Sequence, residues 1–400
     1  MISSVAISSL STRQVASGIR HRPGFVWIDS VENGGFSILG TDPGLILEGD
    51  AGDMQRLEQA LAERRLPLSG KGLIHGAAIG FFRFDGSFRF GFYDRPLIHD
   101  GSGWMAHPEF SLTVADSKES TFFTPIDFKP EIPEAAYVAM VNRAKDYVSS
   151  GDIYQVCLAH RFSSPFEGDP WPLYLSLREE SPAPHAAFLA LGNQTILSSS
   201  PECFLKMDDR SVMTRPIKGT RPRGSTPLED ERLARELTAS AKESAELLMI
   251  TDLERNDLGQ VCEFGSVTVA RLLELEVHPQ VFHLVSTVEG TLRSDVSHVQ
   301  ALAACFPGGS ISGAPKKRAL EIISELEPTP RGLFTGAIGY FGYNGQSQFN
   351  IAIRTLVIED HQAGFHVGAG ITADSDPEQE WQETLHKAAG ILKAARTTIG

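Results

Sequence analysis

One short stretch of sequence occurs twice in the chain, and this echo limits the possible folds more than any other feature. Residues 78–86 read AIGFFRFDG, and residues 337–345 read AIGYFGYNG. Each copy is rich in strand-forming residues and ends in Asp-Gly or Asn-Gly, which favours a hairpin turn and a returning strand. The copies are too far apart for a solenoid repeat. We therefore expect two related α/β halves, each a large antiparallel sheet with helices on one face.

Length and local patterns supply the other expected elements. With 400 residues and 42% hydrophobic content, the chain can bury a large core in two domains or in one two-layered unit. The patterns predict a strand pair over Gly72–Phe92, with a turn at Asp85-Gly86. They predict two helices, over Arg56–Arg65 and Glu134–Ser149. An irregular boundary segment is expected over Ser117–Pro133.

Charge and cysteine spacing exclude several classes of protein. The net charge of -14 and the absence of a basic run argue against a nucleic-acid partner. No apolar run reaches the ~18 residues of a membrane-spanning helix. Four separate cysteines predict buried thiols in a reducing compartment, and we expect a cytoplasmic protein. The acid-free amino terminus resembles a transit peptide, but it lacks an amphipathic face, so an ordinary strand and loop is the favoured interpretation.

Two pairs of acidic residues have a spacing that suits metal binding. Glu243 and Glu246 lie three residues apart, as do Glu380 and Glu383, so each pair lies on one helix face. Lys387 follows Glu383 by four residues on the same face. Two such faces meeting would form an all-oxygen site for a hard cation such as Mg²⁺. The alternative is two solvated helix faces, which the same spacing also describes.

Two basic residues and a glycine-rich loop are further candidates. Arg354 interrupts the apolar stretch Asn350–Ile358, where it must meet a buried acid or bind a ligand carboxylate. Lys218 would be a surface lysine on composition alone. The loop Phe306–Lys317 is expected to enter a helix at Pro315 and to present backbone N–H groups to an anion. Its glycine spacing does not match a nucleotide-binding P-loop.

Several motifs in order along the chain resemble those of the chorismate-utilising enzymes, a family that includes anthranilate, aminodeoxychorismate, isochorismate and salicylate synthases. The resemblance covers at least Ile132 to Leu392. The motifs that carry it are Ser200–Glu202, Pro216–Gly224, Asp252–Gly259, Ser312–Lys316 and Gly368–Ile371.

The resemblance implies a fold, a ligand and a set of site residues. The fold would be of α+β type, with two interleaved halves and the active site between them. Residues 1–126 and 132–392 would form one compact unit. The substrate would be chorismate, a dianion, with Mg²⁺ as cofactor. The implied roles are metal binding by Glu243, Glu246, Glu380 and Glu383; acid–base catalysis by Glu202; carboxylate binding by Arg354, Tyr340, Gly368 and Gly370; and pocket positions at Lys387, His283, Ser310, Thr220 and Gln155.

Two positions favour one branch of this family. Gln155 stands where isochorismate and salicylate synthases have a lysine base, and an amide cannot activate water in that way. Ammonia is then the expected nucleophile. Lys218 resembles the covalent nucleophile of aminodeoxychorismate synthases, whereas anthranilate synthases usually have alanine there. The chain has no glutaminase elbow, so a separate glutamine amidotransferase is the expected partner. Anthranilate synthase is the close alternative, and a non-catalytic binding protein the distant one.

Overall fold

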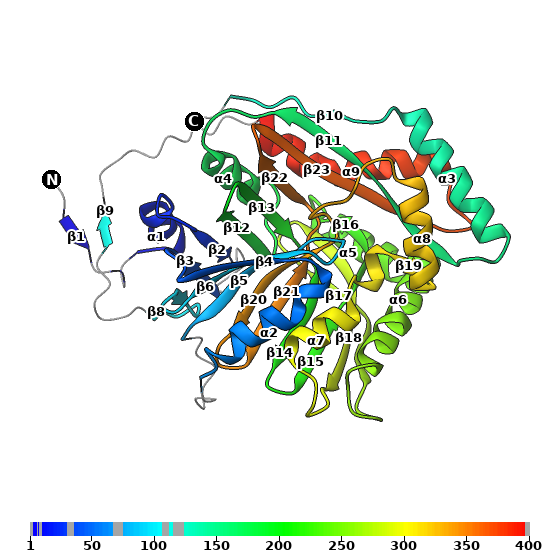
Figure 1. Ribbon diagram of the computed structural model, residues 1–400. Helices are drawn as coiled ribbons and strands as arrows, with labels where there is room; N and C mark the ends of the chain where they lie inside the picture. Colours follow the sequence, from blue (N-terminus) through cyan, green and yellow to red (C-terminus); the bar gives the residue numbers. More distant parts are fainter. Residues whose placement is uncertain are drawn as a thin grey trace.

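A computed structural model describes residues 3–5, 7, 10–29, 36–66, 75–105, 112–114 and 124–396. Two large sheets dominate it, and Figure 1 shows helices packed on the outer side of each. Every strand pair within them is antiparallel. The fold is therefore of the expected α+β type, with two large antiparallel sheets and helices.

The larger sheet carries the strands that surround the carboxyl-terminal helix. Its order is β10-β11-β23-β22-β13-β12-β2-β3-β7-β8, and β19 pairs separately with β11. The strands span β10 Lys129–Pro130, β11 Gln155–Pro165, β23 Gln362–Ile371, β22 Thr355–Glu359, β13 Gln194–Ser200, β12 His185–Leu191, β2 Val26–Asp29, β3 Ser37–Gly40, β7 Leu97–His99, β8 Trp104–Met105 and β19 Gly313–Ala314.

The second sheet has the order β16-β18-β15-β14-β21-β20-β5-β6-β4, with β17 on the other edge of β18. A small separate pair joins β1 and β9. The strands span β16 Ile217–Pro222, β18 Val281–Thr291, β15 Ser211–Arg215, β14 Cys203–Asp208, β21 Gln346–Ile351, β20 Ala337–Gly342, β5 Ala77–Phe82, β6 Phe88–Tyr93, β4 Leu45–Gly49, β17 Thr268–Val277, β1 Ser3–Val5 and β9 Leu112–Val114.

The helices divide between the two sheets. α3, α4, α8 and α9 pack on the larger sheet, and α2, α5, α6 and α7 pack on the second (Figure 1). A third apolar cluster, with residues from both sheets, fills the space between them. The helices span α1 Thr12–Ile19, α2 Met54–Ala62, α3 Glu134–Ser149, α4 Pro170–Glu180, α5 Pro227–Thr238, α6 Ala241–Gly259, α7 His298–Cys305, α8 Lys316–Leu326 and α9 Pro377–Arg396, with 3-10 turns η2 Ala51–Asp53 and η3 Gly309–Ile311.

The repeated sequence forms neighbouring strands of a single sheet. The first copy forms the β5–β6 hairpin and the second the β20–β21 hairpin, and β5 pairs directly with β20. Gly80 lies opposite Gly339 in this pairing, at equivalent positions of the two copies. The expectation that each copy would build its own half is therefore wrong. Each hairpin has one strand edge with free backbone N–H and C=O groups, and the two edges pair with each other through β5 and β20.

Most of the predicted local elements are present. The helix at Glu134–Ser149 has the predicted bounds. The helix expected over Arg56–Arg65 is α2, which begins two residues and ends three residues before the predicted bounds. The hairpin turn at Asp85-Gly86 is confirmed, with Gly86 at φ +85°. The first residues of that predicted strand pair, 72–74, lie outside the described residues, as does most of the first half of the boundary segment.

Two exclusions drawn from composition also find structural counterparts. Among the described residues, no helix is long and apolar enough to cross a membrane. All four cysteines are free and buried, as predicted.

Candidate active site

Lys218 lies at the junction of the two sheets. Strand β16 has an irregularity between Lys218 and Thr220, at Gly219, whose φ is +75°. The Lys218 Nζ lies 3.4 Å from the carbonyl oxygen of Ser310, to which it donates. A Cβ added to Gly370, on β23 of the other sheet, would lie 3.7 Å from that Nζ. The site around Lys218 therefore lies where the two sheets meet.

Gln155 begins β11 and faces the same space. The side chain is fully buried, and neither its amide nitrogen nor its amide oxygen has a hydrogen-bond partner in the described part of the chain. A Cβ on Gly370 would lie 2.9 Å from the Gln155 Nε2, so glycine at that position keeps the space open. A buried amide with no partner costs free energy unless a ligand or water satisfies it. Gln155 thus marks a place for a polar ligand.

Glu202 is a buried acid close to Lys218. Burial raises the pKa of its carboxyl, while the Ser310 side chain and the positive charge of Lys218 act in the opposite direction. The residue lies just before β14, and Ile351 donates its backbone N–H to the Glu202 carbonyl. A carboxyl that keeps its proton to higher pH is suited to donate that proton to a leaving group.

His283 and Arg354 line a small pocket beside this site, together with His278 and four prolines. The Nδ1 of His283 lies 3.0 Å from the Oγ1 of Thr220, so strand β18 fixes the ring against strand β16. Burial lowers the pKa of His283 to about 4, and the charge of Arg354 acts in the same direction. The imidazole is therefore neutral at pH 7, and because Nδ1 is bonded to Thr220, Nε2 is the ring nitrogen that remains for a ligand.

Arg354 does not lie within a strand as the sequence suggested. The apolar stretch breaks after Ile351, and Thr355 begins β22, with Arg354 between them at φ +48°. A charged side chain cannot enter the apolar space on either face of the sheet without a partner, so the strand ends there. Burial lowers the pKa of the guanidinium. Within the described residues the guanidinium makes no hydrogen bond or ion pair, so it is able to bind an anionic group.

Tyr340 lies in a different place from the other predicted pocket residues. Its ring contacts Phe36, with 6.5 Å between centroids, and it lines a cavity of about 230 Å³ between the sheets. Asp29 also lines this cavity, and its Oδ1 has no hydrogen-bond partner in the described part of the chain. Arg354 does not line this cavity, but Pro184 lines both this cavity and the pocket of Arg354, so the two spaces adjoin each other.

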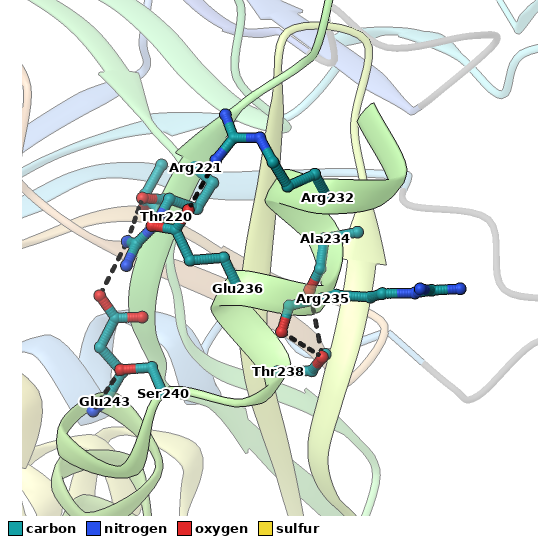
Figure 2. A network of polar contacts seen from close by, with 9 residues as sticks. All are labelled: Thr220, Arg221, Arg232, Ala234, Arg235, Glu236, Thr238, Ser240 and Glu243. Carbon is teal, nitrogen blue, oxygen red and sulfur yellow. Dashed lines mark hydrogen bonds and ion pairs between the residues drawn. The ribbon is translucent and has the colours of Figure 1, made fainter. Parts of the chain in front are cut away.

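The first acid pair lies in the first two turns of α6. Glu243 Oε1 accepts a hydrogen bond of 2.9 Å from Arg221 Nη1, and Figure 2 shows this contact. Its Oε2 is buried without a partner in the described residues and lies against Gly219, where any Cβ would collide with it. Glu246 is half-buried. Glu243 therefore has one oxygen already bonded and one oxygen open.

The second acid pair lies at the start of α9. Glu380 is buried and accepts from Ser375 at 2.7 Å, and burial together with the charge of Glu383 raises its pKa. Glu383 forms an ion pair of 2.7 Å with Lys387, whose Nζ also donates to the carbonyl of Gly368 at 2.9 Å. Burial opposes ionisation of Glu383, but the charges of Lys387 and Lys242 outweigh it and lower its pKa.

The two acid pairs face a common space without closing on it. Lys242, on α6, acts electrostatically on both acids of α9, and Lys218 acts on Glu383. No three His, Cys, Asp or Glu side chains among the described residues converge closely enough to hold an ion. Carboxylate oxygens and the open Oε2 of Glu243 nevertheless suit a hard cation. The donor chemistry therefore fits Mg²⁺. In the described structure Arg221 holds Glu243 on α6, and Lys387 holds Glu383 on α9.

An ion pair that the sequence analysis missed supports the pocket from behind. Arg331 binds Glu327 through two bonds of 2.7 and 2.9 Å, and both side chains are buried. Arg331 also donates to the carbonyls of Cys157 and Ile311, at 2.8 and 3.0 Å, and Glu327 accepts from the N–H of Ala159. The only sequence signal is a Glu and an Arg four residues apart, which is common on solvated helix faces.

Glu254 is a second acid that the sequence did not single out. It accepts from the N–H of Gly309 at 2.9 Å and from the hydroxyl of Thr214 at 3.4 Å. Burial, reinforced by the charge of Asp257, raises the pKa of Glu254 to about 7, while Lys316 opposes the shift. Glu254 thus holds the loop at Gly309, which is directly followed by Ser310.

Comparison with known proteins gives consistent matches. A family model described as chorismate binding enzyme matches residues 97–393. The anthranilate synthase component 1 of Synechocystis sp. is 47% identical over 281 residues, which are 68% of this chain and 55% of that protein. The aminodeoxychorismate synthase component 1 of Bacillus subtilis is 44% identical over 283 residues, 71% of this chain and 60% of that protein. The matched region thus spans little more than half of these relatives.

Solved structures share the whole fold. The anthranilate synthase component I of Streptococcus pneumoniae has a TM-score of 0.78 and 29% identity, and the match covers 98% of this chain and 100% of that one. The menaquinone-specific isochorismate synthase of Escherichia coli has a TM-score of 0.80 at 19% identity, covering 99% and 94%, and shows the likeness of fold alone.

Proposed function

The chain belongs to the chorismate binding enzyme family, and on that premise we propose that it aminates chorismate with ammonia to give 4-amino-4-deoxychorismate, as component I of an aminodeoxychorismate synthase. The observation that carries this proposal is Lys218, whose Nζ reaches the space between the sheets beside Glu202 and Gly370. A surface lysine would have no reason to take that position.

Substrate binding in this proposal depends on groups that have no partner inside the protein. Arg354 is half-buried and has no acid partner among the described residues. It would bind one carboxylate of chorismate through its two-pronged guanidinium. The backbone of Gly368 and Gly370 would approach the same carboxylate closely, because neither residue has a side chain in the way. These local cations and donors would offset the repulsion between a dianion and a chain of net charge -14.

The proposed chemistry proceeds in two substitutions. The amine of Lys218 bonds to ring carbon C2, the ring double bonds shift, and the C4–O bond breaks. Glu202 donates the proton with which the hydroxyl departs as water, and the lysine nitrogen loses a proton. Ammonia then bonds to C4, the double bonds shift back, and the C2–N bond breaks to release Lys218. The balance is chorismate plus ammonia to aminodeoxychorismate plus water.

We also propose that Mg²⁺ is the cofactor, held by Glu243, Glu246, Glu380 and Glu383. The ion would supply positive charge that binds a carboxylate of the substrate. What supports this proposal is the all-carboxylate donor set and the unpartnered Oε2 of Glu243. Lys387, which bridges Glu383 and the carbonyl of Gly368, would keep the carboxylates oriented toward the ligand.

The proposed nitrogen source is free ammonia, delivered by a glutamine amidotransferase on a separate chain. The names of the relatives as component 1 support a two-component enzyme. With ammonium salt the chain alone should turn over, and with glutamine alone it should not. Glutamine-dependent turnover by the pure chain would contradict a separate amidotransferase.

A second function deserves equal weight, because one of the two sequence relatives reported above and the solved structure from Streptococcus pneumoniae carry another name. Anthranilate synthase component I would use the same pocket but place the amino group at C2 and release pyruvate. The 47% identity to a protein of that name favours this alternative, and Lys218 favours the first.

One product assay separates the two functions. The purified chain, chorismate, ammonium chloride and Mg²⁺ are incubated, and the products are identified by liquid chromatography with mass spectrometry while pyruvate is measured in parallel. Aminodeoxychorismate without pyruvate supports the first proposal. Anthranilate with one equivalent of pyruvate establishes the second, and Lys218→Ala should then retain activity. Lys218→Ala should abolish aminodeoxychorismate formation if the lysine is the nucleophile.

A further inference from the structure

Arg221 occupies a position between two acids of successive helices. Its Nη1 donates to Glu243 Oε1 at 2.9 Å, and its Nε donates to Glu236 Oε1 at 3.0 Å (Figure 2). Glu236 lies near the end of α5 and Glu243 in the first turn of α6, with the short turn around Ser240 between them. A third bond, from Nη1 to the carbonyl of Thr220, fixes the guanidinium to its own strand.

Glu243 is the acid for which this contact matters, because it belongs to the proposed metal set. Its side chain is 19% exposed, and a Ser240 side chain caps its backbone N–H. Its Oε1 is bonded to Arg221, and its Oε2 has no partner among the described residues. Within that part of the chain, Arg221 is the positive group bonded to this carboxylate. A guanidinium and a divalent cation both seek the same negative charge.

We propose that Arg221 is a tethered cation that competes with the divalent metal ion for Glu243, and that Glu236 sets the strength of the competition. Glu236 offers the guanidinium a second carboxylate, so that Arg221 can remain paired when the metal ion takes the charge of Glu243. This inference rests on the proposed metal role of Glu243 and adds the residues that tune its affinity. Neither Arg221 nor Glu236 needs to touch the substrate.

The competition predicts opposite effects for the two partners. Removing Arg221 frees Glu243, and a partly buried hydrogen bond between charged groups corresponds to about a tenfold step in an equilibrium. Arg221→Gln should therefore bind the metal about tenfold more tightly. Removing the charge of Glu236 leaves Arg221 with Glu243 alone, so Glu236→Gln should bind the metal several-fold more weakly.

The experiment is a titration of the metal-free full chain with Mn²⁺, followed by electron paramagnetic resonance of the free ion, without substrate or turnover. Each variant has a control with the same change of charge on α5. Arg235→Gln is the control for Arg221→Gln, and Glu231→Gln for Glu236→Gln, because Arg235 and Glu231 pair with each other on the exposed helix surface. Figure 2 shows Arg235 directed away from Arg221. Both controls should bind Mn²⁺ within about twofold of the wild type, since exposed charges at this distance are screened.

The double variant Arg221→Gln/Glu236→Gln completes the test. Glu236 also accepts a hydrogen bond of 3.2 Å from Arg232 on α5, but it reaches Glu243 through Arg221. The double variant should therefore bind Mn²⁺ as tightly as Arg221→Gln. Weaker binding by both single variants would mean that Arg221 orients Glu243 for the ion, which overturns the competition. Equal effects of a variant and its control would overturn it as well. A wild type that binds no Mn²⁺ at all would instead overturn the proposed metal site, and a thermal melt of each variant shows that it is folded.

Discussion

At the scale of single residues, Arg354 makes the most direct prediction about the pocket. Arg354 is half-buried, and its guanidinium has no protein partner among the described residues. Arg354→Lys keeps the charge but loses the two-pronged geometry. We therefore expect kcat/KM for chorismate to fall, by an amount that corresponds to a rise of about 1.5–3 kcal/mol in the activation free energy. Steady-state kinetics at varied chorismate concentration measures it.

The melting temperature of Arg354→Lys provides the control. Because no group in the described part of the chain is bonded to this guanidinium, the variant should melt close to the wild type. Unchanged kinetics in a folded variant would show that Arg354 does not bind the substrate.

Glu254 makes a prediction about stability and pH. Its pKa rises from 4.5 to about 7 because the folded protein buries it. Below pH 4.5 the carboxyl is protonated in both the folded and the unfolded state, so Glu254 does not lower the free energy of unfolding there. Between these values the unfolded state ionises first, so the free energy of unfolding falls as pH rises, by about 3 kcal/mol in total. Glu254→Gln cannot ionise and should gain stability over the wild type by that amount between pH 4.5 and 7.

Urea unfolding at pH 5 and at pH 8 measures the effect. The advantage of Glu254→Gln should be larger at pH 8, and the exposed acid Glu231, changed to Gln, should show no such trend. An equal difference at both values would mean that Glu254 is ionised at pH 5 in the folded protein.

At the scale of elements, the ion pair of Arg331 and Glu327 holds the strand and loop behind the pocket. Arg331→Gln leaves Glu327 as a buried charge without its partner and should destabilise the protein by about 3–5 kcal/mol. The double variant Glu327→Gln/Arg331→Met removes both charges and should recover most of that loss. Its KM for chorismate should still rise, because Arg331 no longer joins the carbonyls of Cys157 and Ile311 and the segments beside the pocket lose that common hydrogen-bond donor.

Calorimetry and steady-state kinetics on both variants separate stability from positioning. A double variant with wild-type stability and wild-type KM would show that the pair contributes to stability alone.

The sequence predicted elements well where one local pattern decides the outcome. The helix at Glu134–Ser149 has a regular apolar pattern, and the hairpin at Asp85-Gly86 has a turn that few other residue pairs form. The break at Arg354 was missed because the apolar run around it is continuous in the sequence. The pairing of the two echoes was missed because a repeat says nothing about which strand edges meet. Arg221 and Glu254 have partners far away in the chain, which no local pattern reveals. Glu327 is only four residues from Arg331, but that spacing is common on solvated helix faces and does not show that the pair is buried.

At the scale of the whole molecule, the amino-terminal region is part of both sheets. Residues 1–126 supply β2, β3, β7 and β8 to the larger sheet and β4, β5 and β6 to the second. A fragment of residues 127–400 would expose the edges of β12 and β20 and the apolar cluster between the sheets. We therefore expect this fragment to lack cooperative unfolding and near-ultraviolet circular dichroism. A fragment that melts in one sharp transition would show an independent carboxyl-terminal domain.

Lys218 comes from one sheet and Gly370 from the other, so any molecule that fills the space between them acts as a reversible cross-link. Such a molecule binds only the folded chain, and mass action then turns its affinity into heat resistance, about 2.7 kcal/mol when its concentration is one hundred times its dissociation constant. Chorismate analogues that cannot react should therefore delay thermal unfolding in proportion to the logarithm of their concentration. A simple dye-based melt would then report occupancy of the pocket in variants that have lost all turnover.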